Sequence, residues 1–529
     1  MIDKKKVKRP LNIFFAVFIL MQPFLDTIFL YSDTVISYFG FSPSTIFRFT
    51  TVGVMLGVIF LLEQVPVKAK IMTSVYLGIT ILYFIAHHLA ASKFVLSNGK
   101  QMAYSFFNEF FYMCRLILPV ILIFITYYIG ISLKSIFRLV VCVSLIMSSI
   151  IIVSNLLCVS LDSYTNETIK ANIFAWFANG YQVNGFNGLA SKGFFYFANQ
   201  IAAIFIMLFP IVFLEIIREK SVWAGVALVA QSIAMIMLGT KISTFGALLS
   251  IAFCLITYLF FVIIRKEKWN WITPAASLIV IVLCVVLIPH SPAMFRLNVH
   301  NNTVQLQNSQ KTEPSQVPST ASSSAASSGA ADNNKDADCE NIEPDDLPGF
   351  SEKEKKLQYI EENYKRLKIN EKFILEAYPY KLDPEFWYAI LQEPAANRLN
   401  NRFLEISMVQ RAKELGGSSV HTLLGISYTK MVSFFNIERD IVSQYYSMGI
   451  VGVILFLGPI ILLFLVALYL LFRKFQNNFN LTNTLLISSL GIVLIAGFIS
   501  GNTLDNLFVT ILMAVICGGL CKSLWEKPE

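Results

Sequence analysis

The stretch ITPAASLIVIVLCVVLIP, residues 272–289, contains no charged residue and is long enough to cross the hydrocarbon core of a membrane as an α-helix. Comparable apolar runs recur along the 529-residue chain, which is 55% hydrophobic and only 14% charged. In a soluble protein of this size, about a quarter of the residues would be charged. The runs do not alternate as the strands of a membrane β-barrel do. The sequence therefore predicts an all-α, polytopic membrane protein.

The apolar runs predict about twelve membrane-spanning helices. They are expected at roughly 11–31, 45–63, 71–91, 104–128, 137–158, 195–214, 221–239, 243–263, 272–289, 442–472, 482–500 and 505–521. Every second connection carries at least two Lys or Arg residues, which is the pattern of cytoplasmic loops. The first run is long and lacks a small-residue cleavage site, so we interpret it as a retained span. The sequence thus predicts a multi-pass protein of the cell membrane with both termini in the cytoplasm.

This pattern divides the chain into three parts. Residues 1–289 form an N-terminal membrane bundle of about nine spans, and residues 442–529 form the C-terminal spans. Between them, residues 290–441 form a large extracytoplasmic loop. Within this loop, 305–350 is rich in Ser and Ala with few large apolar residues, so it is predicted to be disordered. Residues 351–416 show helical spacing of apolar side chains and are predicted to be ordered.

The ordered part of the loop carries recognisable helix ends. Ser351 is expected to cap one helix, and Pro384 is expected to open another. A third helix within NRLNNRFLEISMVQRAKELGG is expected to end at Gly416. In that helix Arg398 and Arg402 are four residues apart, so they are predicted to share one face.

Composition argues against several kinds of site. Of the eight cysteines, seven lie in apolar segments, and only Cys339 lies in the large polar loop, without a partner for a disulfide there. The five histidines show no metal-ligand spacing, so no metal site or cofactor is predicted. The net charge of +8 is concentrated in short loops that set membrane orientation, and no nucleic-acid partner is expected.

Charged residues at or near the outer ends of the predicted helices are the candidates for chemistry, because each costs several kcal/mol inside a membrane unless it is paired or hydrated. Three of them lie in FFNIERDIVSQYYSMGIVG, residues 434–452, directly before a long apolar run. They come from distant parts of the chain, yet the predicted topology sends nearly all of them to one surface: Arg48, Glu109, Arg115, Lys192, Lys241, Arg398, Arg402, Glu438, Arg439 and Asp440.

A basic cluster at that surface suits a phosphate or pyrophosphate headgroup anchored by a lipid tail, since Arg binds such groups with two hydrogen bonds. Neighbouring acids could accept a proton from a hydroxyl group. A structural interpretation stays open for each residue. Arg48 and Lys241 can extend to the membrane surface from helix ends, and Glu109 and Arg115 can pair with other helices. The acids of 438–440 can stabilise the start of the next helix.

Two segments resemble the O-antigen ligase and O-antigen polymerase superfamily of bacterial membrane glycosyltransferases. The segment GFFYFANQIAAIFIMLFP places Gly193, Asn199 and Pro210 where the family has a Gly, an Asn and a Pro. In IMLGTKISTFGALL, the pair Thr240-Lys241 takes the place of a Ser/Thr-Arg pair. The cation is kept, but the forked geometry of Arg is lost.

A third segment extends the resemblance from NRFLEISMVQRAKELGGSSVHTLLGISY to ERDIVSQYYSMGIVGVILF. The family has a histidine near the start of the span that follows the large loop. This chain has no histidine there and carries Glu438, Arg439 and Asp440 instead. The likeness covers about residues 190–470 and agrees with the predicted topology. The residues that match in order are Arg402, Gly425, Glu438 or Asp440, Gly449 and Gly452.

The resemblance implies a metal-independent glycosyltransferase of surface polysaccharide biosynthesis. Its donor would be a glycan on undecaprenyl pyrophosphate, and its partners would be that lipid-linked oligosaccharide, membrane lipid and other polysaccharide-assembly proteins. Polymerisation of repeat units is slightly favoured over ligation of a finished glycan. Catalytic roles fall to Glu438, Asp440 and Arg402, with one of the acids accepting the hydroxyl proton. Substrate-binding roles fall to Lys241, Arg398, Arg48, Asn199 and Lys192.

Two other classes of protein fit parts of the sequence. A transporter or flippase for lipid-linked saccharides would also be polytopic, but such proteins often contain internal repeats, and no clear repeat is apparent. A sensor or assembly protein could use the helical part of 351–414 to bind a partner. The gathering of charges near one predicted surface favours the glycosyltransferase.

Overall fold

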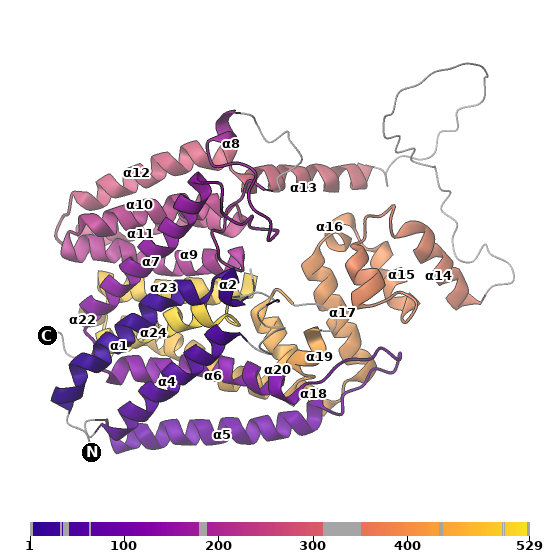
Figure 1. Ribbon diagram of the computed structural model, residues 1–529, viewed down its shortest axis with the longest axis horizontal. Helices are drawn as coiled ribbons and strands as arrows, with labels where there is room; N and C mark the ends of the chain where they lie inside the picture. The colour runs from indigo at the N-terminus through magenta and orange to yellow at the C-terminus, as the bar shows by residue number, and fades with distance from the viewer. Residues whose placement is uncertain are drawn as a thin grey trace.

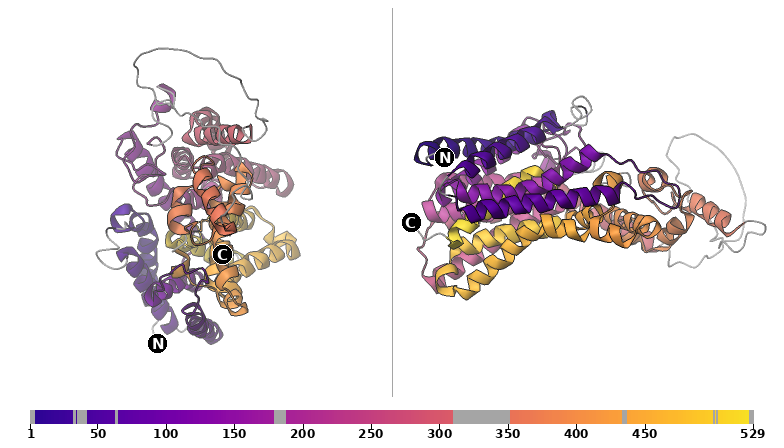
Figure 2. Two further views of the ribbon diagram at one scale, coloured as in Figure 1. Left: turned by 90° about the vertical axis from the view of Figure 1, so that its right-hand side faces the viewer. Right: turned by 90° about the horizontal axis from the view of Figure 1, so that it is seen from below.

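The computed structural model describes residues 4–31, 34, 42–62, 65–178, 188–309, 351–432, 437–499, 501 and 503–525. Within these residues the chain consists of helices and turns, and three isolated bridges in loops are the β-structure it contains. Long helices lie side by side in a bundle, and a group of shorter helices lies at one end of it (Figures 1 and 2). The predicted all-α polytopic fold is therefore confirmed.

In the described part of the chain, nine helices are long and apolar enough to cross a membrane. They are α4 (Pro43–Leu61), α5 (Val67–Ala91), α6 (Phe106–Tyr128), α7 (Leu133–Leu156), α9 (Ala198–Glu219), α11 (Lys241–Arg265), α12 (Ile272–Leu287) with η2 (Ile288–His290), α23 (Leu481–Ile499) and α24 (Leu507–Trp525). A tenth span is formed if α20 (Asp440–Phe456) and α21 (Gly458–Arg473), which are bent by 43° at their junction, count as one.

The predicted count of about twelve spans is thus corrected to nine or ten by length and composition, among the described helices. The other two predicted spans coincide with α1 (Lys4–Leu25) and α10 (Val222–Met237). The first turns of α1 are basic, and α10 has 16 residues, which is about 24 Å of helix. Both still pack within the bundle, α1 against α7 and α10 against α7 and α9.

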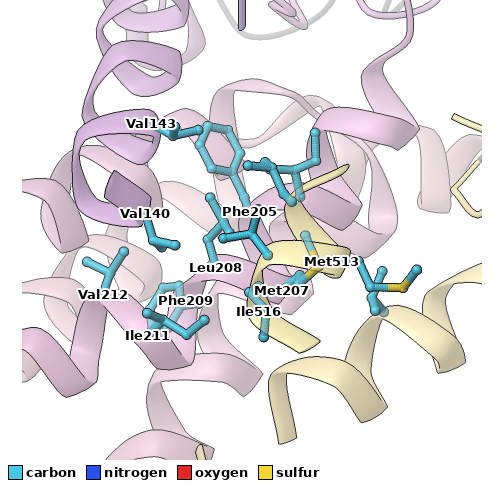
Figure 3. Close-up of a cluster of buried hydrophobic side chains, with 14 of the residues drawn as sticks. Val140, Val143, Phe205, Met207, Leu208, Phe209, Ile211, Val212, Met513 and Ile516 are labelled. Atoms are coloured by element: carbon cyan, nitrogen blue, oxygen red, sulfur yellow. The ribbon is translucent and has the colours of Figure 1, made fainter. Parts of the chain in front are cut away.

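Helices α9 and α24 form the centre of the bundle, and nearly all of their residues are buried. Lipid tails are as apolar as these side chains, so close packing rather than exclusion from water stabilises this core. Gly518 lets α24 approach α6 closely, because a Cβ atom there would lie 2.5 Å from the Cβ of Thr126. Figure 3 shows the packed side chains, which include Val140 and Val143 of α7, Phe205, Leu208 and Phe209 of α9, and Met513 and Ile516 of α24.

The shorter helices outside the bundle are α13 (Pro292–Ser309), α14 (Glu352–Asn363), η4 (Lys372–Ala377), α15 (Pro384–Gln392), α16 (Ala395–Arg398), α17 (Asn401–Gly416), α18 (Ser419–Leu424) and α19 (Tyr428–Val432). Single-turn helices α2 (Ile28–Tyr31), α8 (Ala175–Ala178) and α22 (Phe475–Asn478) lie in connections. Three predicted helix ends are confirmed: Ser351 forms a capping box with Glu354, Pro384 opens α15, and α17 ends at Gly416.

Two predictions about the loop are corrected. Residues 305–309 belong to α13 and so are not disordered, while the rest of the Ser/Ala-rich segment lies outside the described residues. Arg398 and Arg402 do not share a helix face, because Arg398 ends α16 and Arg402 lies in the first turn of α17. Asn400 between them has an extended backbone and caps α17, which breaks the helix there.

A second hydrophobic core holds α14–α17 together and joins them to the bundle. Trp387 is fully buried in it and donates from Nε1 to the carbonyl oxygen of Tyr378 at 2.6 Å. Phe94 and Leu96, from the connection between α5 and α6, belong to the same core. The start of α1 and the end of α24 lie at the end of the bundle opposite to α14–α17 (Figure 1). Which compartment each end faces stays a prediction.

Helix α20 is broken at Gly449, whose φ of 69° and ψ of −178° are open essentially only to glycine. The break frees carbonyl groups that would be costly if left unbonded within a membrane. The turn after α18 supplies donors to them: the N–H of Ile426 to Tyr446 at 2.9 Å and the N–H of Ser427 to Ser447 at 3.1 Å. The broken helix is therefore completed by a segment that precedes it in the chain.

Gly425 makes this approach possible, since its φ is 88° and a Cβ atom there would overlap the carbonyl group of Ser447. Glu109 of α6 anchors the same turn by accepting the N–H groups of Tyr428 and Thr429 at 2.9 and 3.1 Å. His87 of α5 lies between Glu109, at 2.8 Å, and the carbonyl oxygen of Leu424, at 2.6 Å. Glu109 thus serves packing between helices, which was one of its two interpretations.

We expect Gly449→Ala to destabilise the protein by about 1–3 kcal/mol, because the backbone conformation at this position is strained for any residue with a Cβ atom. The substitution also forces a Cβ atom against the carbonyl group of Leu423. Thermal unfolding of the purified chain in detergent measures the change. Gly78→Ala in α5 is the matched control, since nothing lies within 4 Å of its Cβ position. Equal unfolding temperatures for the two variants would contradict this account of the break.

Candidate active site

The ion pair of Arg402 and Glu438 lies where three helices meet. The side chain of Asn400 accepts the N–H of Arg402 at 3.1 Å and so starts α17. Nε of Arg402 donates to Oε2 of Glu438 at 2.6 Å, and its Nη1 donates to the carbonyl oxygen of Ile499, the last residue of α23, at 3.0 Å. The two charged side chains are 31% and 36% exposed. The pair joins α17, the start of α20 and the end of α23, and both charges stay within reach of solvent.

Glu405 is a second carboxyl group directly behind this pair. It lies three residues after Arg402, hence on the same face of α17, and its side chain is buried. Its Oε2 accepts the backbone N–H of Glu438 at 3.2 Å. Burial and, to a smaller extent, the nearby Glu438 carboxylate raise the pKa of Glu405 to about 8, against the opposing effects of the hydrogen bond from the Glu438 N–H and of the Arg402 charge. Burial therefore favours the protonated form of Glu405 at neutral pH.

Asp440 fastens the connection between α23 and α24 to the start of α20. Its Oδ2 accepts the backbone N–H groups of Thr503 at 2.8 Å and Leu504 at 2.6 Å, and the side chain is buried. Gly501, with a φ of 65°, lies so close to the carbonyl oxygen of Glu438 that a Cβ atom would overlap it. Asp440 therefore acts as an anchor: it ties the connection at 503–504 to the start of α20, next to the Glu438 backbone.

Lys192 lies in the connection before α9 and is nearly buried. Its Nζ donates to Oδ1 of Asn166 at 3.0 Å and to the carbonyl oxygen of Thr165 at 3.3 Å. Burial lowers the pKa of Lys192 to about 8, while the Asp162 carboxylate acts in the opposite direction. The amine therefore changes its charge close to neutral pH.

Lys241 opens α11 and is exposed. The hydroxyl group of Tyr164 donates a hydrogen bond of 2.7 Å to the carbonyl oxygen of Gly239, two residues before Lys241. The guanidinium group of Arg296 from α13 lies over the Tyr164 ring, 3.5 Å from its centre. Lys241 and Arg296 thus border the same loop that contacts Lys192.

The side chains of Arg48 and Arg398 are buried, and both bond to groups inside the protein. Arg48 donates from Nε to Oε1 of Gln22 at 2.8 Å and forms an ion pair with Asp26 at 3.4 Å. Arg398 donates from Nη1 to the carbonyl oxygen of Glu393 at 3.2 Å. Asn199, the second residue of α9, is half-buried. These three positions differ in surroundings from the accessible pair formed by Arg402 of α17 and Glu438, which lies two residues before α20.

Five of the eight predicted site residues form two groups. One group centres on Arg402 and Glu438, with Asp440 behind them, and the other contains Lys192 and Lys241. Helix α13 contacts both α11 and α16, so it connects the two sides. Within the described residues, no group of three or more His, Cys, Asp or Glu side chains could hold a metal ion.

Sequence reasoning missed four residues of this region, namely Glu405, Gly501, Tyr164 and Arg296. Glu405 could have been found from the sequence, because residues three apart, such as Arg402 and Glu405, share a helix face. No local pattern marks the other three, because their roles depend on segments that are distant in the chain.

We expect Glu405→Gln to make the protein more stable at alkaline pH. The pKa of Glu405 is raised from 4.5 to about 8 in the folded state. The folded state therefore binds the proton more tightly than the unfolded chain, and stability decreases as pH rises through this range. Glutamine keeps an acceptor for the Glu438 N–H and removes the titration, so the gain should be on the order of 1 kcal/mol or more at pH 8.5 and small at pH 5.

Thermal unfolding of wild type and variant at pH 5, 7 and 8.5 measures this difference. Glu376→Gln is the control, because that side chain is exposed. A difference between wild type and Glu405→Gln that does not grow with pH would show that Glu405 is not the titrating group.

Comparison with known protein families gives one match, to the family described as O-antigen ligase like membrane protein, over residues 8–527. A search of curated proteins found no match. The family agrees with the resemblance drawn from three segments and extends it to nearly the whole chain. It indicates a glycosyltransferase-type membrane protein that acts in surface polysaccharide assembly. The chain belongs to the family of O-antigen ligase-like membrane proteins.

Proposed function

We propose that the chain transfers a glycan from undecaprenyl pyrophosphate to a hydroxyl group of an acceptor, with polymerisation of repeat units favoured over ligation. The observation that carries this proposal is the accessible Arg402–Glu438 ion pair backed by the buried Glu405. An anchored lipid tail would stay in the bilayer while its sugar reaches this group at the end of the bundle beneath α14–α17. We further propose that this end faces away from the cytoplasm, and that the reaction needs no metal ion.

Arg402 is assigned to the diphosphate. Its guanidinium group is charged at all physiological pH values and matches the geometry of phosphate oxygens. Charge that develops on the leaving diphosphate would be stabilised there, in a site partly shielded by helices. Lys241 is exposed at the start of α11, where the helix dipole also favours an anion. Lys192 is the second candidate cation, because it lies in the loop next to Lys241.

Glu438 is assigned as the proton acceptor. The acceptor hydroxyl oxygen attacks the anomeric carbon, the bond from that carbon to the diphosphate oxygen breaks, and the hydroxyl proton passes to the Glu438 carboxylate. The diphosphate leaves on its lipid with the bonding electron pair. Glu438 is preferred to Asp440 because it is accessible, whereas Asp440 is buried and accepts two backbone N–H groups. Glu405 holds the backbone of Glu438 in place.

A transporter or flippase for lipid-linked saccharides is the second candidate. The break of α20 at Gly449 favours it, because transporters often use interrupted helices near their binding sites. Profiling of lipid-linked intermediates in a deletion strain separates the candidates. Accumulated single repeat units indicate a polymerase, unattached full-length glycan indicates a ligase, and precursors trapped inside the cell indicate a flippase.

We expect Arg402→Lys and Glu438→Gln each to lower the rate of glycan transfer by about 10²–10³-fold, because each removes a group that acts mainly in the transition state. The purified full-length chain in lipid nanodiscs, supplied with lipid-linked glycan, provides the assay. Arg411→Lys is the matched control: Arg411 lies on the same helix, is also 31% exposed, and pairs with Asp383 at 2.8 Å. Wild-type rates in both site variants would end the proposal. Unchanged rates in the presence of a chelator are expected from the same mechanism.

Asp440→Asn tests the distinction between anchor and base. Loss of the carboxylate weakens two charge-assisted hydrogen bonds, so we expect stability to fall by about 1–3 kcal/mol together with activity. Glu438→Gln should lower activity with little change in unfolding temperature. A stable but inactive Asp440→Asn would instead assign the proton transfer to Asp440.

A further inference from the structure

A cavity of about 680 Å³ lies between α1 and α7, at the end of the bundle opposite to the candidate active site. Its walls are apolar at Ile13, Ala16, Ile131 and Leu139. Its polar lining is mostly basic and comes from the first turns of α1 and α7: Lys8, Arg9, Asn12, Ser135 and Arg138. A volume of this size falls within the range of ligand sites.

A second, apolar hollow of about 450 Å³ continues from this cavity along the outside of α1. The two share Arg9 and Ile13, and the second is completed by Pro10, Phe14 and Val17. Ile13, Phe14 and Val17 are among the exposed large apolar side chains of the chain. Both hollows are open toward the outside of α1; the basic one is called the chamber below, and the apolar one the channel.

The polar groups of the chamber are incompletely satisfied within the described residues. Lys8 and Arg9 form no ion pair with any described side chain, whereas Arg138 is shared with Glu215 and Glu219 of α9 at 4.0 and 3.4 Å. Oδ1 of Asn12 is buried and accepts no hydrogen bond from the described residues. The chamber thus offers two exposed cations that no described acidic side chain neutralises.

We propose that this chamber and channel bind an anionic diacyl phospholipid of the adjacent leaflet. The phosphate lies between Lys8 and Arg9, where charge complementarity is greatest. One acyl chain follows the channel past Ile13 and Val17.

The bound lipid fills the wedge between α1 and α7. At the other end of α1, Asp26 directly follows the helix and forms an ion pair with Arg48 of α4. The bound lipid thus holds one end of α1, and this ion pair holds the other. The site is separate from the proposed glycan transfer and does not depend on it.

Native mass spectrometry of the full-length chain tests the proposal. The chain is released from nanodiscs that contain phosphatidylglycerol and phosphatidylcholine in equal amounts. Wild type should retain phosphatidylglycerol preferentially, and Lys8→Gln/Arg9→Gln should bind it about 30-fold more weakly, the loss expected for two interfacial cations. The control Lys68→Gln/Lys268→Gln removes two exposed charges from the same end of the bundle, outside the cavity. Equal losses in both double variants would reduce the effect to overall charge and overturn the site.

A second variant keeps the charges and fills the chamber. Ala16→Leu should also release phosphatidylglycerol, and thermal unfolding checks that the variant is folded; full retention in a folded Ala16→Leu would overturn the proposed position. Two competitors identify the source of the phosphate. Displacement of the lipid by millimolar inorganic phosphate, or preferential retention of a polyprenyl phosphate, would each overturn the assignment to a diacyl phospholipid.

Discussion

The rest of the structure depends on a rule of the bilayer, that backbone groups within a membrane must find hydrogen-bond partners inside the protein. Helix α20 breaks at Gly449, and the turn at Gly425 enters against it to bond the carbonyl groups that the break exposes. Both glycines have backbone angles that side chains resist, and each would carry a Cβ atom into the other's segment. Glu109 of α6 and His87 of α5 then hold the inserted turn. This contact holds the broken part of α20 against α5 and α6.

The charged residues of the region divide by accessibility into two kinds. Arg48, Glu109 and Asp440 are buried, and the hydrogen bonds and ion pairs of each fasten one element to another. Arg402 and Glu438 are partly exposed and paired across two helices. A buried charge with a full set of partners is suited to fixing geometry, whereas an accessible one can exchange a protein partner for a ligand. This division is the physical basis for assigning chemistry to the second kind.

The two ends of the bundle have different characters. At one end, α14–α17 pack through their own core onto the connection between α5 and α6 and cover the candidate site. At the other end, the first turns of α1 and α7 place basic side chains around a cavity that is apolar toward the lipid. The first end suits a lipid-borne diphosphate with a soluble sugar, and the second suits a lipid headgroup alone.

The amino-acid sequence by itself determined the class of fold, because hydropathy and the length of an apolar run are local properties. The cap at Ser351, the helix start at Pro384 and the end at Gly416 were equally readable, since each depends on a few adjacent residues. The spacing of Arg398 and Arg402 predicts a shared helix face, but Asn400 between them caps α17 and starts a new helix there. Only the tertiary structure placed Glu405 behind Glu438, Gly501 against its carbonyl group, and Arg402 on the end of α23. Such contacts join segments tens of residues apart, and they arise from how the helices pack, which no local pattern encodes.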